Sequence, residues 1–128
     1  MIIDGFNKLT LLDSVRDING NTIKTFEPVI YNQFSMPQSN WDAIHKGMRT
    51  VVEKKSYFNE LTVNVAGKTG TAEESERRPN HALFVGYAPY ETPEIAITSR
   101  IPYGYSSDYA AQVTKDVIAY YYGLMDEE

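Results

Sequence analysis

The segment Gly67-Lys68-Thr69-Gly70-Thr71-Ala72 brings an amine and two hydroxyls together in six consecutive residues. Gly-Lys-Thr also occurs in loops that bind nucleotide phosphates, but such a loop needs a glycine five residues earlier and a helix directly afterwards. Thr62 stands at that glycine position, and the alternation of Leu61, Val63 and Val65 indicates a strand that runs into the motif. We therefore reject a phosphate-binding loop.

Lys-Thr-Gly on a strand resembles the third motif of penicillin-binding proteins and serine β-lactamases, where it lies on an edge strand at the acylation site. The surrounding sequence is most similar to the transpeptidase domain of class B, elongation-type penicillin-binding proteins. The similarity extends from about Leu9 to Leu124 and includes, in order, the Asn19-Gly20 ribbon, the helix Trp41 to Val52, the stretch Val65 to Glu73, His81-Ala82-Leu83-Phe84-Val85-Gly86-Tyr87-Ala88-Pro89, and a final helix containing Ala110-Ala111.

This resemblance implies roles for four residues of the motif. Lys68 would place a positive charge beside the nucleophilic serine, and the hydroxyls of Thr69 and Thr71 would hold the substrate carboxylate by charge-assisted hydrogen bonds. Gly70 would let the strand lie close to the helix that bears the nucleophile. The backbone N–H of Thr71 would form half of the oxyanion hole. The alternative interpretation is an ordinary edge strand with a bend at Gly70.

The nucleophile of this family stands in a Ser-x-x-Lys motif, and no serine of this chain is followed by lysine three residues later. Tyr57-Phe58-Asn59 matches the second family motif by its letters, but that element lies far upstream in the family, so we treat the match as a coincidence. The resemblance therefore predicts a C-terminal portion of a transpeptidase domain. Without the nucleophile and its lysine base, this chain alone is expected to be inactive.

Composition and charge exclude several other functions. The 128 residues carry 12 basic and 17 acidic side chains, a net charge of -5 with no basic cluster, which argues against nucleic-acid binding. No cysteine is present, so disulfides, zinc–thiolate sites and cysteine nucleophiles are excluded, and we predict no metal and no cofactor. No apolar run approaches a membrane helix and no signal peptide is visible, so we expect this chain to be soluble. The resemblance implies a parent at the cell membrane, with this domain on the extracytoplasmic face.

The elements that must hold the motif follow from hydrophobic periodicity and turn residues. They predict an α+β fold, an antiparallel sheet meander with packed helices, in one fragment spanning residues 1–128. The expected order is a lead at 1–8, a β-ribbon at 9–27, an irregular connection at 29–38, a helix at 40–55, a three-stranded meander at 61–101 carrying Lys-Thr-Gly-Thr, and a C-terminal helix at 108–124.

Finer details of these elements are also predicted. Ser39 or Asn40 is expected to cap the first helix, and Ser107 the second. Lys54 and Lys55 suit the C-terminal end of the first helix. The strand from His81 to Ala88 is apolar in both alternating positions, which is typical of a central strand covered on both faces. The last helix is expected to pack through Ala110, Val113, Val117, Tyr121 and Leu124.

Other polar residues receive simpler interpretations. His81 is interpreted as a structural residue with satisfied ring nitrogens, because no metal ligands accompany it. Glu73 and Glu74 are interpreted as a charged loop end, since adjacent strand residues point to opposite faces. The segment 103–109 contains three tyrosines, Tyr103, Tyr105 and Tyr109. The sequence leaves two alternatives open for them, that they line a groove or that they pack under a loop.

Two functions from different classes remain. The first is part of a peptidoglycan D,D-transpeptidase, whose partners would be the stem peptide, β-lactams and the missing N-terminal part of the domain. The second is a non-catalytic module of the same fold that binds peptidoglycan or a protein. A D,D-carboxypeptidase or β-lactamase is less favoured, because the sequence around the motif resembles class B enzymes. Apolar surface left uncovered is expected to cause self-association or partial disorder of residues 1–40.

Overall fold

The computed structural model describes residues 5–7, 12–27, 29–33 and 35–125. The chain forms two compact units, Met1–Trp41 and Asp42–Glu128. The first helix, α1 (Gln38–Glu53), crosses the boundary between them.

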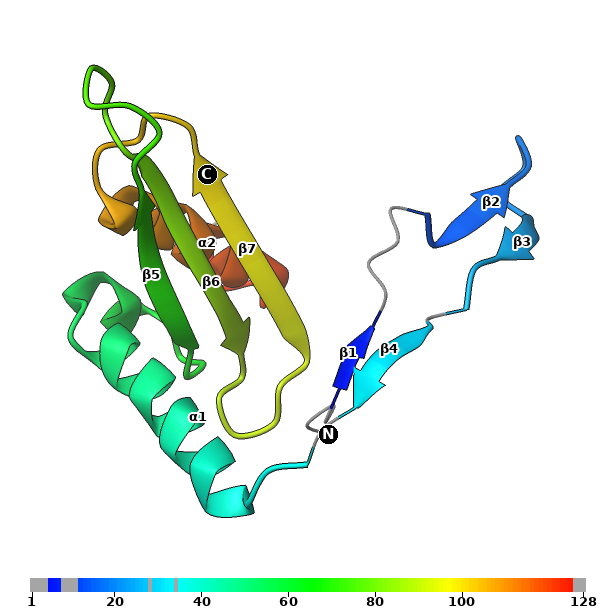
Figure 1. The fold of residues 1–128 in the computed structure, drawn as a ribbon, viewed down its shortest axis with the longest axis horizontal. Helices are drawn as coiled ribbons and strands as arrows, with labels where there is room; N and C mark the ends of the chain where they lie inside the picture. Colours follow the sequence, from blue (N-terminus) through cyan, green and yellow to red (C-terminus); the bar gives the residue numbers. More distant parts are fainter. Residues whose placement is uncertain (1–4, 8–11, 28, 34, 126–128) are drawn as a thin grey trace. The chain divides into compact units, whose positions relative to one another are not determined.

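The first unit is a ribbon of two nested antiparallel strand pairs (Figure 1). Strand β2 (Ser14–Arg16) pairs with β3 (Thr22–Thr25), and β1 (Gly5–Asn7) pairs with β4 (Ile30–Gln33). At the turn, Asp17 accepts the backbone N–H groups of Asn19 and Asn21, while Gly20 adopts a φ of 86° that favours glycine. The ribbon predicted from Asn19-Gly20 is confirmed over residues 14–25, and residues 9–11 of the predicted range 9–27 lie outside the described residues.

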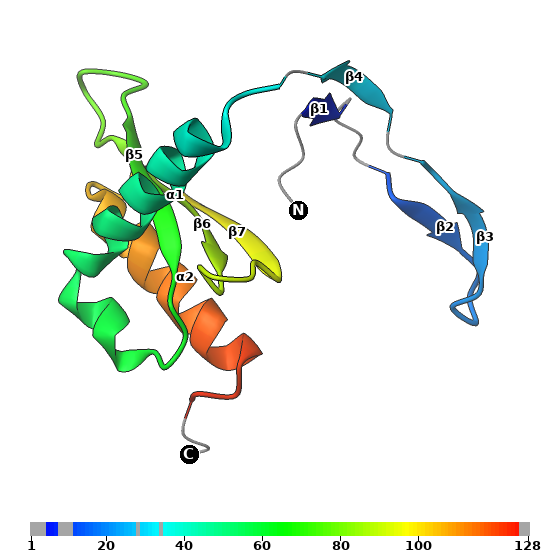
Figure 2. The same ribbon diagram turned by 90° about the horizontal axis from the view of Figure 1, so that it is seen from below.

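The second unit is a three-stranded antiparallel sheet covered on one face by a helix (Figures 1 and 2). The strands lie in the order β5 (Ala66–Ala72), β6 (His81–Ala88) and β7 (Ile95–Ile101), and α2 (Ser107–Tyr121) packs against all three. A short 3₁₀ helix, η1 (Ser56–Glu60), connects α1 to the segment before β5. The predicted α+β class and the meander are confirmed.

The core of this unit lies between β6, α2 and η1. Phe84 is fully buried and stacks on Phe58, with ring centroids 5.9 Å apart. Its ring lies over the cross-strand pair Gly67–Gly86, where a side chain on either glycine would meet it. The remaining core residues come from both helices and the strands: Val52, Val65, Ala82, Ala88, Ala110, Ala111 and Ile118.

Several predicted boundaries are wrong. The lead at 1–8 contains β1, and the connection at 29–38 contains β4, because these two segments pair with each other beyond the predicted ribbon. Strand β5 begins at Ala66 instead of 61. Leu61 and Val63 pack against the core from an irregular segment, so their alternation reflects burial and not strand pairing.

The first helix begins and ends two residues earlier than predicted. Ser39 and Asn40 are already helical, and the N–H of Asn40 bonds to the carbonyl of Pro37, so neither serves as the cap. Lys54 and Lys55 lie beyond the helix end. Lys55 instead pairs with Asp108 in the first turn of α2.

The packing face predicted for α2 is confirmed at Ala110 but wrong at Val113, Val117 and Tyr121, and Leu124 lies beyond the helix end. Val113 and Val117 are both 47% exposed, whereas the neighbouring Thr114 and Ile118 are fully buried. Small residues at 110 and 111 let the helix approach the sheet, and the hydroxyl of Thr114 donates to the carbonyl of Ala110, which makes its burial tolerable. Ser106, not Ser107, caps the helix by accepting the N–H of Asp108.

Strand β6 is not covered on both faces as predicted. Ala82, Phe84 and Ala88 face α2 and are buried, but Val85 on the opposite face is 45% exposed. Tyr87 on that face is half-buried and bonds to His45 of α1 at 2.8 Å. In the described part of the chain, no helix is long and apolar enough to cross a membrane.

Candidate functional site

The Lys-Thr-Gly-Thr motif occupies the middle of β5, which lies at one edge of the three-stranded sheet. From Lys68 to Thr71, each residue has a Cα partner on β6, and the strand continues to Ala72. No helix follows in the 73–80 segment, so the rejected phosphate-binding loop is also absent from the structure. An edge strand offers side chains on two faces and unpaired main-chain groups along one side.

The four candidate residues differ in exposure. Lys68 and Thr71 are exposed, whereas Thr69 and Gly70 are half-buried. The amine of Lys68 donates to the carbonyl of Thr69 at 2.6 Å, so it lies over its own strand. A Cβ at Gly70 would come within 3.3 Å of the Leu83 Cβ, a tight contact. Lys68 and Thr71 are thus both accessible on an edge strand, and a cation and a hydroxyl are groups suited to binding a carboxylate, although alternation along the strand directs these two side chains to opposite faces.

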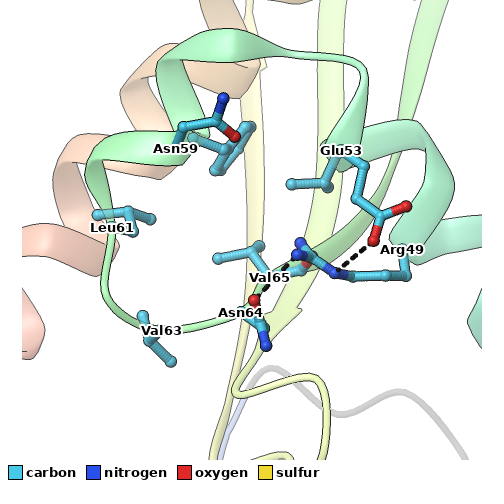
Figure 3. A pocket seen from close by; sticks show the side chains of 9 residues that line it. Arg49, Glu53, Asn59, Leu61, Val63, Asn64 and Val65 are labelled. Atoms are coloured by element: carbon cyan, nitrogen blue, oxygen red, sulfur yellow. Dashed lines mark hydrogen bonds and ion pairs between the residues drawn. The ribbon is translucent and has the colours of Figure 1, made fainter.

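Arg49 of α1 holds the segment that leads into β5, and Figure 3 shows its contacts with Asn64 and Glu53. Its guanidinium donates to the carbonyl of Val65 at 3.0 Å and to the side-chain oxygen of Asn64 at 2.9 Å, and it pairs with Glu53 at 3.3 Å. Asn64 in turn donates to Glu91 at 2.6 Å, which lowers the pKa of that carboxyl. These contacts fix the point where the chain enters the strand.

A cavity of about 230 Å³ lies beside this contact (Figure 3). It is enclosed by the end of α1, by η1 and by the segment before β5: Arg49, Val52, Glu53, Phe58, Asn59, Leu61, Val63, Asn64 and Val65. The motif residues of β5 do not line it. The cavity therefore belongs to the junction that supports the strand and not to the exposed edge.

The other end of β5 is held by His81, which pairs with Ala72 across the sheet. His81 is 7% exposed, and both ring nitrogens have partners. Nδ1 accepts the backbone N–H of Tyr103 at 3.1 Å, and Nε2 contacts Glu74 at 2.9 Å. The interpretation of His81 as a residue with satisfied ring nitrogens is confirmed.

Sequence reasoning missed the partners at both ends of the strand. Nothing in the sequence links Arg49 to the carbonyl of Val65 16 residues away, although Glu53 at the i+4 position does suggest an ion pair. Glu74 lies in the loop after β5, as predicted, and in addition accepts hydrogen bonds from His81 and from the hydroxyl of Tyr103. In the described ranges, no cluster of three His, Asp or Glu side chains is arranged to hold a metal ion.

Comparison with known proteins agrees with this arrangement. The chain is similar to the peptidoglycan D,D-transpeptidase MrdA of Acinetobacter baumannii, with 33% identity, covering 69% of this chain and 16% of the relative. MrdA of Haemophilus influenzae is 29% identical, covering 84% of this chain and 20% of the relative. Among solved structures, PBP2 of Pseudomonas aeruginosa has a TM-score of 0.67 and 33% identity, covering 85% of this chain and 24% of that one. The resemblance to elongation-type enzymes is confirmed.

A further structure is the imipenem acyl-enzyme complex of penicillin-binding protein A from M. tuberculosis, with a TM-score of 0.63 and 24% identity, covering 82% of this chain and 24% of that one. At this identity the likeness shows the fold alone. The chain spans about a fifth or less of the length of the curated relatives it matches. The family model for the penicillin binding protein transpeptidase domain matches residues 4–119. The chain therefore belongs to the penicillin-binding protein transpeptidase domain family.

Proposed function

We propose that this chain forms one wall of the active site of a peptidoglycan D,D-transpeptidase. In this role β5 binds the carboxylate of a stem peptide or of a β-lactam, and the rest of the domain supplies the nucleophilic serine and its lysine base. The observation that carries the proposal is the position of the family motif on an exposed sheet edge, with Lys68 and Thr71 both accessible. The similarity to MrdA enzymes supports the reaction class.

The proposed roles follow from the chemistry of acyl transfer. Lys68 supplies a fixed positive charge near the nucleophile, and the hydroxyls of Thr69 and Thr71 orient the donor through its carboxylate. The backbone N–H of Thr71 stabilises the oxyanion that develops on the donor carbonyl. Since the chain has no Ser-x-x-Lys motif, the attack itself must come from outside these 128 residues. The complete protein is proposed to act at the extracytoplasmic face of the cell membrane.

The experiment measures covalent labelling by a fluorescent penicillin. The isolated chain should form no denaturation-resistant adduct, because a carboxylate-binding strand positions an acyl donor but cannot attack it. In the complete domain, Lys68→Ala should slow acylation by about 10²- to 10³-fold. Thr71→Val should weaken binding while leaving the backbone N–H in place.

Lys54→Ala is the matched control, because Lys54 is an exposed lysine in the turn after α1 and does not belong to β5. Its acylation rate should equal that of the wild type. A stoichiometric adduct on the isolated chain would contradict the absence of a nucleophile. A complete domain that is indifferent to Lys68→Ala would refute the proposed role of the motif.

A further inference from the structure

Two loops meet at the C-terminal end of β5, next to Thr71. In the antiparallel pairing, Thr71 lies opposite Ala82, and Ala72 lies opposite His81. Gly104 packs so closely on Ala82 that an added Cβ would come within 2.9 Å of the Ala82 Cβ. The segment 102–106 therefore lies against β6 at the residue directly across from Thr71.

His81 joins these loops through both of its ring nitrogens. Because Nδ1 accepts the N–H of Tyr103, a neutral ring must carry its proton on Nε2, which then donates to Glu74. The hydroxyl of Tyr103 also donates to Glu74 at 3.2 Å, and Arg78 donates to that hydroxyl at 2.8 Å. The rings of His81 and Tyr103 are tilted toward each other, with centroids 4.9 Å apart. A closed set of contacts thus links residues 74, 78, 81 and 103.

The backbone at this point is held in an uncommon conformation. Tyr103 has a φ of 54° and Tyr105 a φ of 62°, both in the left-handed region that side chains other than glycine rarely adopt. The N–H of Tyr105 is fixed by the carbonyl of Asn80, the residue before His81. Such strain persists only where the surroundings hold it, and it is concentrated at functional sites.

We infer that Glu74, His81 and Tyr103 are positioning residues that fix the end of β5 and thereby set the placement of Thr71 for acyl transfer. None of them needs to touch substrate, because they act through the pairing of β5 with β6. Glu74 and Tyr103 lie outside the hydrophobic core, so the cluster is placed to control the strand end more than global stability. This inference rests on the proposed function.

The test uses the complete domain and measures the first-order acylation rate constant and the dissociation constant for a fluorescent penicillin separately. Glu74→Ala removes the acceptor shared by His81 and Tyr103 and should lower the acylation rate constant by about ten- to 100-fold, with little change in the dissociation constant. Glu74→Gln keeps an acceptor oxygen and should restore the rate to within about threefold of the wild type. Tyr103→Phe removes only the hydroxyl and should cause a smaller loss than Glu74→Ala.

Glu76→Ala is the matched control, because Glu76 is an exposed glutamate in the same loop. It should leave the rate unchanged. Equal rates for Glu74→Ala and Glu76→Ala would overturn the inference, as would a Glu74→Gln variant as slow as Glu74→Ala. Lys68→Ala in the same assay separates the two proposals. If Lys68→Ala acylates as fast as the wild type, the proposed function is refuted. If Lys68→Ala acylates slowly but Glu74→Ala acylates as fast as the wild type, only the inference about the positioning residues is refuted.

His81→Ala is a less reliable variant, because it empties a buried position that joins two loops. If this variant does not fold, NMR of the isolated chain provides the second measurement. Glu74→Ala should shift the amide resonances of Gly70 and Thr71 more than Glu76→Ala does. Identical shifts in the two variants would also overturn the inference.

Discussion

The contact between Gly67 and Phe84 provides a sharp test of how β5 is packed. A Cβ added at Gly67 would overlap the Phe84 ring, lying 2.8 Å from its Cε1, and would lie 2.9 Å from the backbone oxygen of Val85. The ring is fully buried, and the backbone oxygen belongs to the neighbouring strand, so neither can yield easily. Gly67→Ala should therefore destabilise the unit by about 3 kcal/mol through overpacking.

Gly47 provides the control, because the same substitution there should have the opposite sign. It lies on the exposed side of α1, and a Cβ there would meet nothing within 4 Å. Replacing glycine by alanine inside a helix gains about 1 kcal/mol of helix propensity. The two variants should therefore differ by about 4 kcal/mol in the free energy of unfolding.

The assay is urea denaturation of the 128-residue chain followed by far-UV circular dichroism. A double-mutant cycle tests whether the cost of Gly67→Ala comes from the Phe84 ring, because Phe84→Leu removes the ring that the new methyl group would contact. Gly67→Ala should cost about 1 to 2 kcal/mol less in the Phe84→Leu background than in the wild type. Additive costs, or a Gly67→Ala variant as stable as the wild type, would refute the packing of Phe84 over this glycine.

Two further predictions concern α2. Lys55 donates to Asp108, which lowers the pKa of that carboxyl, so the ion pair stabilises the fold above about pH 4 and is lost as the pH falls through the lowered pKa. Asp108→Asn should lower the free energy of unfolding at pH 7 by up to about 1 kcal/mol, because the carboxylate is half exposed. The difference from the wild type should shrink toward pH 2, and a difference that does not depend on pH would contradict the pairing. The exposed row of Tyr109, Val113 and Val117 should cause self-association. Light scattering after size exclusion should show a mass that falls on dilution and with Val117→Lys, whereas a dilution-resistant monomer would contradict it.

The sequence is sufficient to predict the inner ribbon, the two helices and the meander in their order, because each has a strong local signal, but it does not predict β1, β4 or η1. The Asn19-Gly20 turn, the apolar run of β6, the alternation through β7 and the helical spacing of the last segment all lead to the observed elements. The prediction of the buried face of α2 is partly wrong because it assumes that large apolar residues are buried and polar ones exposed, and this does not hold where a helix packs closely on a sheet. The sheet selects the small Ala110 and Ala111, and it tolerates Thr114 because two hydrogen bonds satisfy its hydroxyl. Val113 and Val117 remain exposed, whereas Ile118 is buried.

The motif could be located from its letters, whereas the contacts that hold it could not. Arg49 bonds a backbone carbonyl, and such an acceptor carries no sequence signature. The partners of His81 come from two separate loops. The contact between these loops depends on positive φ angles at Tyr103 and Tyr105, which tyrosine residues do not predict. Long-range polar contacts to the backbone are thus the part of the site that only the structure supplies.

The role proposed for β5 poses a physical conflict for an edge strand. Binding the acyl donor requires an open outer side, and in the described sheet β5 pairs with β6 alone, without the second neighbouring strand that would normally hold it in place. In this chain the strand is fixed at its two ends instead, by Arg49 before Ala66 and by His81 opposite Ala72. The face of β5 toward α2 is fixed at Gly67, where the Phe84 ring packs on it. These contacts limit the movement of the Lys68–Thr71 segment from its two ends and from β6, and the proposed function leaves its outer side to the acyl donor.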